Sequence, residues 1–251
     1  MQISVQLYSL RAVGDLDAQL AMVKKVGFSH VESVATHGLS PTDFAARLAA
    51  HGLALSSMHA GIAALEIAVE RDKLIEACKA TGCPLIVMPW LPMSERPSTG
   101  LAWQALGTRL AKLGETINAA GLRLAYHNHD WEFHRYDGKT ALEWIFGAAP
   151  AKLVGWEADL GWVRRAGQAP LEWVDRFSDR LVAVHAKDIA NPGNGRDEDG
   201  WAALGDGLVG WDTLLPKLRA RCSLFILEHD MPSDHELMLR TSLACMQRQL
   251  T

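Results

Sequence analysis

The chain has 251 residues, of which 49% are hydrophobic and 22% are charged, a composition typical of a folded globular protein. A net charge of −4, a pI near 6.2 and the lack of any run of Lys or Arg argue against a surface that binds nucleic acid or anionic membranes. The four cysteines form no CxxC pair, which indicates reduced, buried thiols. With no stretch that resembles a signal peptide or a membrane span, we expect a cytoplasmic protein.

A glycine separates a helical pattern from a strand pattern at several places along the chain. Glycine is favoured directly after a helix because the backbone there turns into a left-handed conformation, and an apolar run follows each of these glycines. The repetition of this junction predicts alternating helices and strands. The junction glycines are Gly27, Gly52, Gly82 and Gly121.

Eight short apolar runs indicate buried strands, and amphipathic segments between them are long enough to be the helices that connect parallel strands. Eight such units in a chain of this length predict an α/β fold of the (β/α)₈ TIM barrel type, as one domain over residues 1–251. An open or nine-stranded sheet is the alternative. The predicted strands are residues 3–8, 30–34, 54–59, 85–89, 122–127, 153–159, 181–187 and 223–228, and the clearest helices are residues 16–26, 42–51, 101–120 and 211–221.

Two longer segments, residues 90–99 and 188–209, follow the predicted fourth and seventh strands. The second is rich in glycine and in acidic residues, which is typical of a polar, conformationally permissive loop. Segments that follow the strands of a barrel lie at its C-terminal face, where barrel active sites are found. We therefore expect both loops beside a functional site.

Polar residues gather at the C-terminal ends of the last four predicted strands, and His127, Asp159, His185 and Glu228 stand at these ends. Alternate residues of a barrel strand point inward, so one side chain from each of these strands can reach a common point. Carboxylates and imidazoles that meet in a partly dry cavity need a positive charge among them. The pattern therefore predicts a site for a divalent cation.

Asp159, His185 and Glu228 are the predicted metal ligands, since each is the clearest inward-facing polar residue at its strand end. The fourth ligand is open between His127, at the end of the fifth strand, and His129 or Glu132 on the turn beyond it. Mixed oxygen and nitrogen ligands without a thiolate suit Mn²⁺, Mg²⁺, Co²⁺ or Zn²⁺, among which we favour Mn²⁺.

Other residues near predicted strand ends are candidates for binding a substrate. Glu32 and His59 are expected at the same mouth, where they would orient a substrate hydroxyl or support a ligand. Lys187 would bind substrate oxygens, unless it forms an ion pair at the rim. Aromatic side chains could form apolar walls, although nine tryptophans also indicate ordinary packing. The wall candidates are Tyr8, Trp90, Trp131 and Trp162, and His129 is a further binding candidate.

Several short segments carry a family pattern: Gln6-Leu-Tyr-Ser-Leu-Arg11, Val31-Glu32, Tyr126-His-Asn-His-Asp-Trp-Glu-Phe133, Asp159-Leu-Gly-Trp162, Val184-His-Ala-Lys-Asp188, Gly205-Asp-Gly207 with Trp211, and Leu227-Glu-His-Asp230. Together they resemble the xylose isomerase-like TIM barrel superfamily, in the branch described as sugar phosphate isomerases/epimerases. The resemblance covers almost the whole chain. Its segments from the fifth to the eighth strand are specific for the superfamily, but not for one substrate.

The resemblance implies a metal set of Glu, Asp, His and Glu from these four strands, with the first and last Glu exchanging protons in the ketose epimerases. Asp159, His185 and Glu228 match the last three positions. The fifth strand departs from the pattern, because His127 precedes Asn128 where the epimerases have Glu. The two-glutamate mechanism would then require Glu132 to fold back into the site.

For function, the resemblance implies that a proton is removed next to the carbonyl of a sugar, through an enediolate that the metal stabilises. Glu228 is the expected base, with His127 or Glu132 opposite it. We expect a metal-dependent isomerase or epimerase of a sugar or sugar phosphate. The alternative is a dehydratase of keto-sugars or inososes, or a keto-glycoside lyase, that uses the same metal site.

Two other classes fit less well. A nuclease for abasic DNA also resembles this superfamily, but it would need more metal-binding histidines and a basic face. A binding module that had lost its reaction would not need polar residues on all four late strands. The expected partner is a small carbohydrate, with neither nucleic acid nor membrane, and a homodimer is compatible with the short chain. Acidic residues 197–199 favour an unphosphorylated sugar, although the segment Gly193-Asn-Gly195-Arg196 together with Lys187 could cradle a phosphate.

Overall fold

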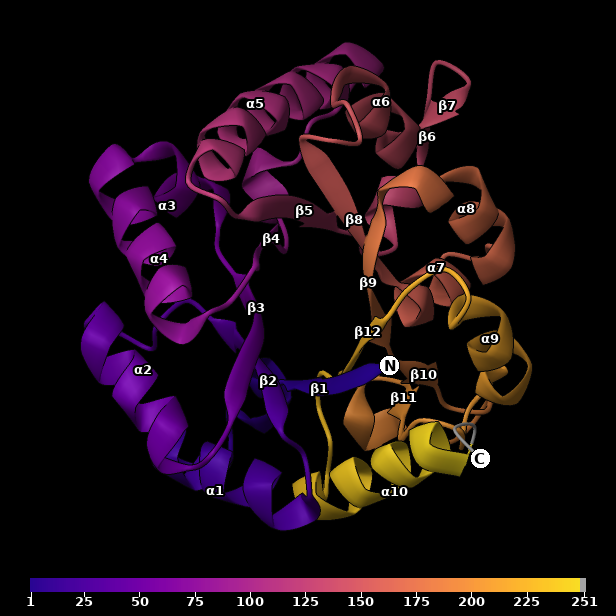
Figure 1. The fold of residues 1–251 in the computed structure, drawn as a ribbon. Coiled ribbons are helices and arrows are strands. Elements are labelled where there is room, and N and C mark those ends of the chain that lie inside the picture. The colour runs from indigo at the N-terminus through magenta and orange to yellow at the C-terminus, as the bar shows by residue number, and fades with distance from the viewer. Residues whose placement is uncertain (249–251) are drawn as a thin grey trace.

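Eight parallel strands close into a barrel inside a ring of helices (Figure 1). The computed structural model describes residues 1–248. The order round the barrel is β1-β12-β9-β8-β5-β4-β3-β2, so each barrel strand pairs with the next one along the chain and the last pairs with the first. The predicted TIM barrel is confirmed. Its strands are β1 (Gln2–Gln6), β2 (His30–Val34), β3 (Ala54–His59), β4 (Leu85–Met88), β5 (Arg123–His127), β8 (Val154–Asp159), β9 (Leu181–Ala186) and β12 (Leu224–Leu227).

The helices lie outside the barrel, and side chains that accept backbone N–H groups fix where several of them begin. Asp15 caps α1, Ser40 caps α2 directly before Pro41, and Thr140 forms a capping box with Glu143 at α6. The junction glycines predicted from the sequence have φ values from 61° to 113°. The helices are α1 (Leu16–Val26), α2 (Pro41–Ala50), α3 (Ile62–Glu66), α4 (Ala68–Thr81), α5 (Gly100–Ala119), α6 (Ala141–Ala148), α7 (Leu160–Arg165), α8 (Pro170–Arg176), α9 (Trp211–Leu218) and α10 (His235–Arg248).

Helices cover the outside of the strands and side chains fill the barrel, so the strands are buried on both faces. Every residue of β4 and of β8 is buried; β4 is therefore a continuous apolar run in the sequence, whereas β8 also carries the buried acids Glu157 and Asp159. The four cysteines are buried and free, as predicted. Within residues 1–248, no helix has the length and the apolar character needed to cross a membrane.

The first strand is shorter than predicted, because the chain turns into a 3₁₀ helix at Leu7–Leu10. The side chain of Gln6 accepts the backbone N–H of Tyr8 at 3.0 Å, which ends the strand and leaves Tyr8 half exposed at the mouth of the barrel. The predicted strand over residues 3–8 is therefore wrong at its C-terminal end. Helix α9 also ends earlier than predicted, at Leu218.

The two long loops carry short elements of their own. Residues 90–99 contain the 3₁₀ turn Met93–Glu95, and residues 188–209 contain an antiparallel pair, β10 (Asp188–Ile189) and β11 (Trp201–Ala202). A smaller hairpin, β6 (Arg135–Tyr136) and β7 (Lys139–Thr140), follows β5. Both long loops leave the C-terminal ends of barrel strands, as predicted, and both supply residues to the cavity described below.

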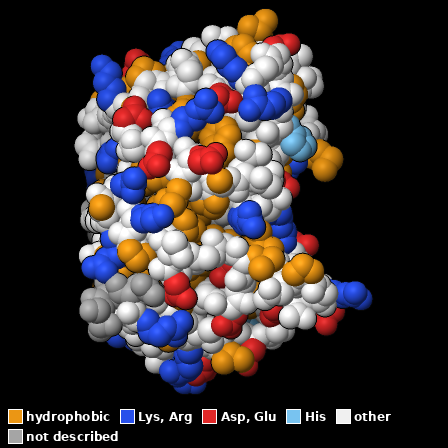
Figure 2. Space-filling model, turned by 90° about the vertical axis from the view of Figure 1, so that its right-hand side faces the viewer, with side chains coloured by type: hydrophobic (Ala, Val, Ile, Leu, Met, Phe, Trp, Pro, Cys, Tyr) orange, Lys and Arg blue, Asp and Glu red, His pale blue; other side chains and the backbone are white. Residues whose placement is uncertain are grey.

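The surface on the side shown in Figure 2 mixes the two signs of charge. Basic side chains are interspersed there with acidic ones, and apolar groups lie between them. This distribution agrees with the net charge of −4 and gives that face no continuous basic track for a phosphate backbone.

Helices α5 and α6 lie side by side (Figure 1), and Gly107 allows their close approach, because a Cβ there would lie 2.3 Å from the carbonyl oxygen of Ile145. We expect Gly107→Ala to destabilise the protein by about 1–3 kcal/mol, since the helices would have to move apart. The matched control is Gly147→Ala on α6, where a Cβ meets nothing within 4 Å and helix propensity favours alanine by up to about 1 kcal/mol. Urea unfolding of both variants measures the difference, and equal stabilities would contradict this account of the packing.

Candidate metal centre

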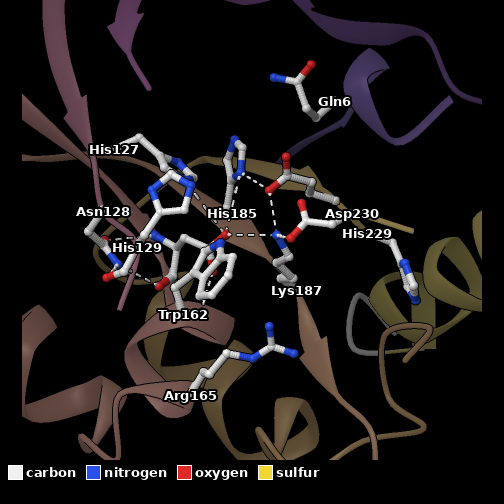
Figure 3. A network of polar contacts seen from close by, with 12 residues as sticks. Gln6, His127, Asn128, His129, Trp162, Arg165, His185, Lys187, His229 and Asp230 are labelled. Carbon is white, nitrogen blue, oxygen red and sulfur yellow. Dashed lines mark hydrogen bonds and ion pairs between the residues drawn. The ribbon is translucent and has the colours of Figure 1, made fainter. Parts of the chain in front are cut away.

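Four polar side chains from neighbouring strands converge at the C-terminal end of the barrel. His127 ends β5, Asp159 ends β8, His185 lies near the end of β9, and Glu228 directly follows β12. One donor atom of each lies within 4.8 Å of a donor atom of every other. Figure 3 shows the rings of His127 and His185 within this network. We call these four residues the outer group.

The distances within the outer group leave a gap in its middle. Oδ2 of Asp159 lies 3.8 Å from Nε2 of His127 and 3.9 Å from Nδ1 of His185, which is too long for a hydrogen bond in either case. That oxygen is buried and has no hydrogen-bond partner. Nδ1 of His185 lies 3.0 Å from Oε2 of Glu228. A buried carboxylate oxygen without a partner is costly, and the arrangement could hold a cation that would relieve this cost.

Asp159 is held in place by backbone contacts rather than by the other ligands. Its Oδ1 accepts the backbone N–H of Trp162 at 2.8 Å and so caps α7, which leaves Oδ2 directed into the outer group. Asn128 joins β5 to this strand end, because its side-chain oxygen accepts the Asp159 N–H and the indole N–H of Trp156. The position of Asp159 is therefore fixed before any ligand binds.

Lys187 lies beside the outer group, fully buried. Its Nζ is 2.7 Å from a carboxylate oxygen of Asp230, 3.2 Å from Glu228 and 3.9 Å from Asp159. Burial alone would lower the pKa of this amine, but Glu228 and Asp230 raise it above its usual range. Lys187 is thus a charged partner of three carboxylates, whereas the sequence prediction placed it among substrate-binding residues.

A second set of buried groups, the inner group, lies deeper in the barrel around Glu157. Oε2 of Glu157 lies 2.8 Å from Nε2 of His59, 3.2 Å from Nδ1 of His127 and 3.1 Å from Nε2 of His185. His127 and His185 therefore face the outer group with one ring nitrogen and the inner group with the other. A carboxylate that accepts from the second nitrogen of a ligand imidazole fixes its tautomer and its orientation.

Glu32 completes the inner group. Its Oε1 lies 2.7 Å from Nε2 of His185 and 3.0 Å from Nε2 of His59, and it also accepts a hydrogen bond from the Gln6 amide at 2.6 Å. Ser57 donates to its other oxygen. The prediction that Glu32 stands at the end of its strand, at the mouth, is wrong. It lies in the middle of β2, fully buried below the cavity.

Both inner carboxylates sit at irregularities of the barrel. The register of β2 against β3 shifts between Val31 and Glu32, and that of β8 against β9 shifts between Trp156 and Glu157. A bulge of this kind re-aims a side chain relative to a regular strand. The shifts thus accompany the turning of Glu32 and Glu157 towards the same histidines.

Protonated histidines and ionised carboxylates lie next to one another in the two groups. Burial alone would lower the pKa of His59, but Glu32 and Glu157 raise it to about 10. Burial would also lower the pKa of His185, but the surrounding carboxylates raise it well above its usual value. Burial and the nearby charge of His185 lower the pKa of His127 to about 4. Before a cation binds, His59 and His185 therefore carry the positive charge that balances Glu32 and Glu157, and His127 is neutral.

The structure separates the three strand-five candidates. His127 belongs to the outer group, whereas Glu132 does not. The Glu132 carboxylate accepts the Tyr126 hydroxyl at 2.6 Å and the backbone N–H of His129 at 2.8 Å, and burial raises its pKa to about 7. His129 stacks on Trp131 with ring centroids 4.1 Å apart, and its Nδ1 is buried without a partner. Glu132 therefore supports the turn rather than reaching the cation site.

A cavity of about 440 Å³ opens over the outer group. Several predicted substrate-binding residues line it, among them His59 and His129. Trp131 does not, because its face is covered by the guanidinium of Arg96, 3.5 Å from the ring centroid. Glu32 and Lys187 also lie outside the lining. The walls are formed by Tyr8, Val34, Pro89, Trp90 and Trp162, and the polar lining by His59, His127, His129, Asp199, Glu228 and Asp230.

Sequence reasoning missed Glu157, Asp199 and Asp230 as residues of the site. Glu157 had a readable signal, since it stands two residues before Asp159 and side chains two apart on a strand share a face. Asp230 stands two residues after Glu228, but beyond the end of β12, where strand periodicity no longer applies. Asp199 comes from the long loop of residues 188–209, and nothing in the local sequence indicates that this residue lies at the cavity.

Comparison with solved structures shows the same fold at low sequence identity. A sugar phosphate isomerase/epimerase from Parabacteroides distasonis ATCC 8503 matches with a TM-score of 0.83 at 18% identity, over 100% of this chain and 95% of that one. The probable 3-DHS dehydratase AsbF from Bacillus anthracis matches with 0.75 at 12%, over 98% and 99%. An IOLI protein with a bound zinc atom matches with 0.74 at 15%, over 100% and 98%.

Among curated proteins, none matches this sequence significantly. The model of the family described as xylose isomerase-like TIM barrel, however, matches residues 20–249, which include every strand of the barrel except β1 and all four residues of the outer group. The chain therefore belongs to the xylose isomerase-like TIM barrel family.

Proposed function

We propose that this protein is a divalent-metal-dependent isomerase or epimerase of sugars, which acts by removing a proton next to a carbonyl. The observation that carries the proposal is the buried Oδ2 of Asp159, which has no partner and faces His127 and His185 across a gap of 3.8 to 3.9 Å. A fold shared with proteins described as a sugar phosphate isomerase/epimerase supports the assignment to sugars.

The donors of the outer group fit a divalent cation. Two imidazole nitrogens and two carboxylate oxygens suit Mn²⁺, Co²⁺ or Zn²⁺, and we favour Mn²⁺, while the similar IOLI protein was found with zinc. His127, Asp159, His185 and Glu228 would hold the ion. When bound there, it would polarise a carbonyl and stabilise the negative charge that develops when the neighbouring carbon loses its proton.

Glu228 is the residue we assign to proton removal. Burial alone would raise its pKa, but Lys187 and His185 hold the pKa well below its usual range, so the carboxylate is ionised and able to accept a proton. It also lines the cavity, where a substrate carbon can approach it. Return of the proton to the adjacent carbon would give an isomer.

The opposite side of the cavity carries imidazoles instead of a second carboxylate. His127 and His129 line that side, and burial lowers the pKa of His129 well below its usual value, so it is neutral and can accept a proton. Epimerisation would use such a group to exchange a proton on the second face of the substrate.

The lack of a second carboxylate opposite Glu228 favours a second candidate, a dehydratase or lyase. Within residues 1–248, no carboxylate from β5 or the turn after it lines the cavity, so the pair of glutamates expected of the ketose epimerases is not assembled. Elimination of a β-oxygen after proton removal needs a proton for the leaving oxygen, which Glu228 could deliver after it has taken up the proton of the substrate. Product analysis distinguishes the two candidates.

Metal binding should release protons. In the metal-free protein His185 is protonated, and burial raises the pKa of Asp159 to about 7 despite the charge of Lys187. Both groups must lose their protons to become ligands. We therefore expect about one proton to be released per Mn²⁺ at pH 8, from His185, and more at pH 6, where Asp159 is also protonated, so that affinity falls as the pH is lowered.

Calorimetric titration with Mn²⁺ in buffers of different ionisation enthalpy measures this proton release. Glu132→Gln is the matched control, because the pKa of Glu132 is also raised to about 7 although its carboxylate lies outside the outer group. The control should bind Mn²⁺ with unchanged proton release, whereas Asp159→Asn should bind far more weakly. Loss of binding in Glu132→Gln, or binding without proton release, would contradict the ligand set.

Glu228→Gln should slow the exchange of the substrate proton with solvent deuterium by about 10²-fold to 10⁴-fold, since the amide cannot accept the proton. The measurement is deuterium incorporation across a panel of ketoses, keto-glycosides and inososes, together with the bound metal content of each variant. Glu132→Gln should retain exchange. Exchange retained in Glu228→Gln would instead place the base on the strand-five side, at His127 or His129.

A further inference from the structure

We propose that the cavity over the outer group takes an uncharged carbohydrate and rejects phosphorylated sugars, an inference that rests on the proposed function. The acidic residues that line the cavity are Asp199, Glu228 and Asp230. Within the described residues 1–248, the lining contains neither Lys nor Arg. A phosphate dianion would therefore meet carboxylates. Of the cations nearby, Lys187 and Arg165 are paired with carboxylates, and Arg11 lies over the ring of Tyr8, 4.1 Å from its centroid.

Lys187 is the first cation that a phosphate would need. Its side chain is fully buried, with Nζ 2.7 Å from Asp230 and 3.2 Å from Glu228. Figure 3 shows the amine of Lys187 beside the carboxylate of Asp230. Lys187 balances Asp230, while Asp159 and Glu228 would balance a divalent cation. The floor of the loaded site thus has no surplus positive charge for a phosphate.

Arg165 is the second cation near the rim, and it is also engaged. Its guanidinium donates to the carboxylate of Asp199 at 3.3 Å and to the backbone carbonyl of the same residue. It also stacks on the ring of Trp201, with Cζ 3.5 Å from the centroid. Figure 3 shows Arg165 apart from the dashed network. Asp199 therefore cancels the charge that Arg165 could offer at the mouth.

The loop after the seventh barrel strand is where many TIM barrels cradle a phosphate with backbone amides. Here the chain fills that cradle with its own carboxylate, because Asp188 accepts the N–H groups of Ile189, Gly205, Gly207 and Val209 at 2.9 to 3.2 Å. The fit is tight: a Cβ at Gly207 would lie 2.3 Å from Oδ1 of Asp188. These amides are not available to a substrate.

The walls of the cavity suit a neutral ring. Tyr8 is 45% exposed and Trp90 is 48% exposed, and both line the cavity together with Trp162. Aromatic faces of this kind pack against the C–H face of a sugar, while the acidic and imidazole groups can bind its hydroxyls. A sugar that covers these exposed aromatic faces would gain affinity for the cavity without an anionic group.

The test compares each free ketose with its own phosphate ester. Mn²⁺-loaded protein is incubated in D₂O with D-fructose, D-tagatose, D-ribulose or D-xylulose, or with the terminal phosphate ester of each, and deuterium incorporation gives kcat/KM. We expect exchange with at least one free ketose, and kcat/KM at least about tenfold lower for its ester because of like-charge repulsion. Faster exchange of an ester would overturn this inference and leave the proposed function standing. No exchange with any sugar of either kind would overturn both.

The variant Asp199→Asn tests the assigned cause. It removes the carboxylate that balances the charge of Arg165 at the rim and leaves the contact of Arg165 with the backbone carbonyl, so the preference for the free ketose over its ester should fall by about threefold or more. The matched control is Asp175→Asn, which breaks a similar ion pair with Arg221, 2.7 Å long, at the end of the barrel where β12 begins. The control should keep the preference of the parent protein. An unchanged preference in Asp199→Asn, or an equal change in the control, would overturn the part assigned to Asp199.

Discussion

The organisation of this molecule depends on the balance of buried charge inside the barrel. Glu157 places one oxygen within 2.8 to 3.2 Å of three imidazoles, and Glu32 places another within 2.7 to 3.0 Å of two of them. Removing a carboxylate from water is costly unless positive charge and hydrogen bonds replace the water. In the inner group, protonated His59 and His185 supply the positive charge, although Oε1 of Glu157 is buried without a hydrogen-bond partner.

The outer group differs, because burial raises the pKa of its Asp159 carboxyl, whereas His185 and His59 overcome burial and hold the pKa of the Glu157 carboxyl well below its usual range. Asp159 keeps one buried oxygen without a partner, and burial raises its pKa to about 7. Because His127 and His185 belong to both layers through different ring nitrogens, the inner carboxylates orient the imidazoles that the outer layer offers to a cation. In the function that we propose, the inner layer is thus the support and the outer layer is the reactive surface.

The fold could be predicted almost completely from the sequence. The site could be predicted only for residues that lie at or next to the ends of barrel strands. The junction glycines and apolar runs placed all eight strands, and errors arose where side chains end an element, as Gln6 does at Tyr8. His127, Asp159, His185 and Glu228 stand at or next to strand ends, so their convergence follows from the barrel alone. Glu32 was misplaced although the predicted strand has the observed bounds, because the third of its five residues lies below the strand end and not at the mouth.

The pairing of buried charges also accounts for the contacts of the loops around the site. Two cations near the cavity are paired within the chain, Lys187 with Asp230 and Arg165 with Asp199, and the loop amides are paired with Asp188. These pairs fix the loops that shape the cavity, and they also remove every one of those groups from contact with an anionic substrate. Interactions that hold the loops in place therefore set which substrates the cavity can accept, because a group that is already paired must lose its partner before it can bind another.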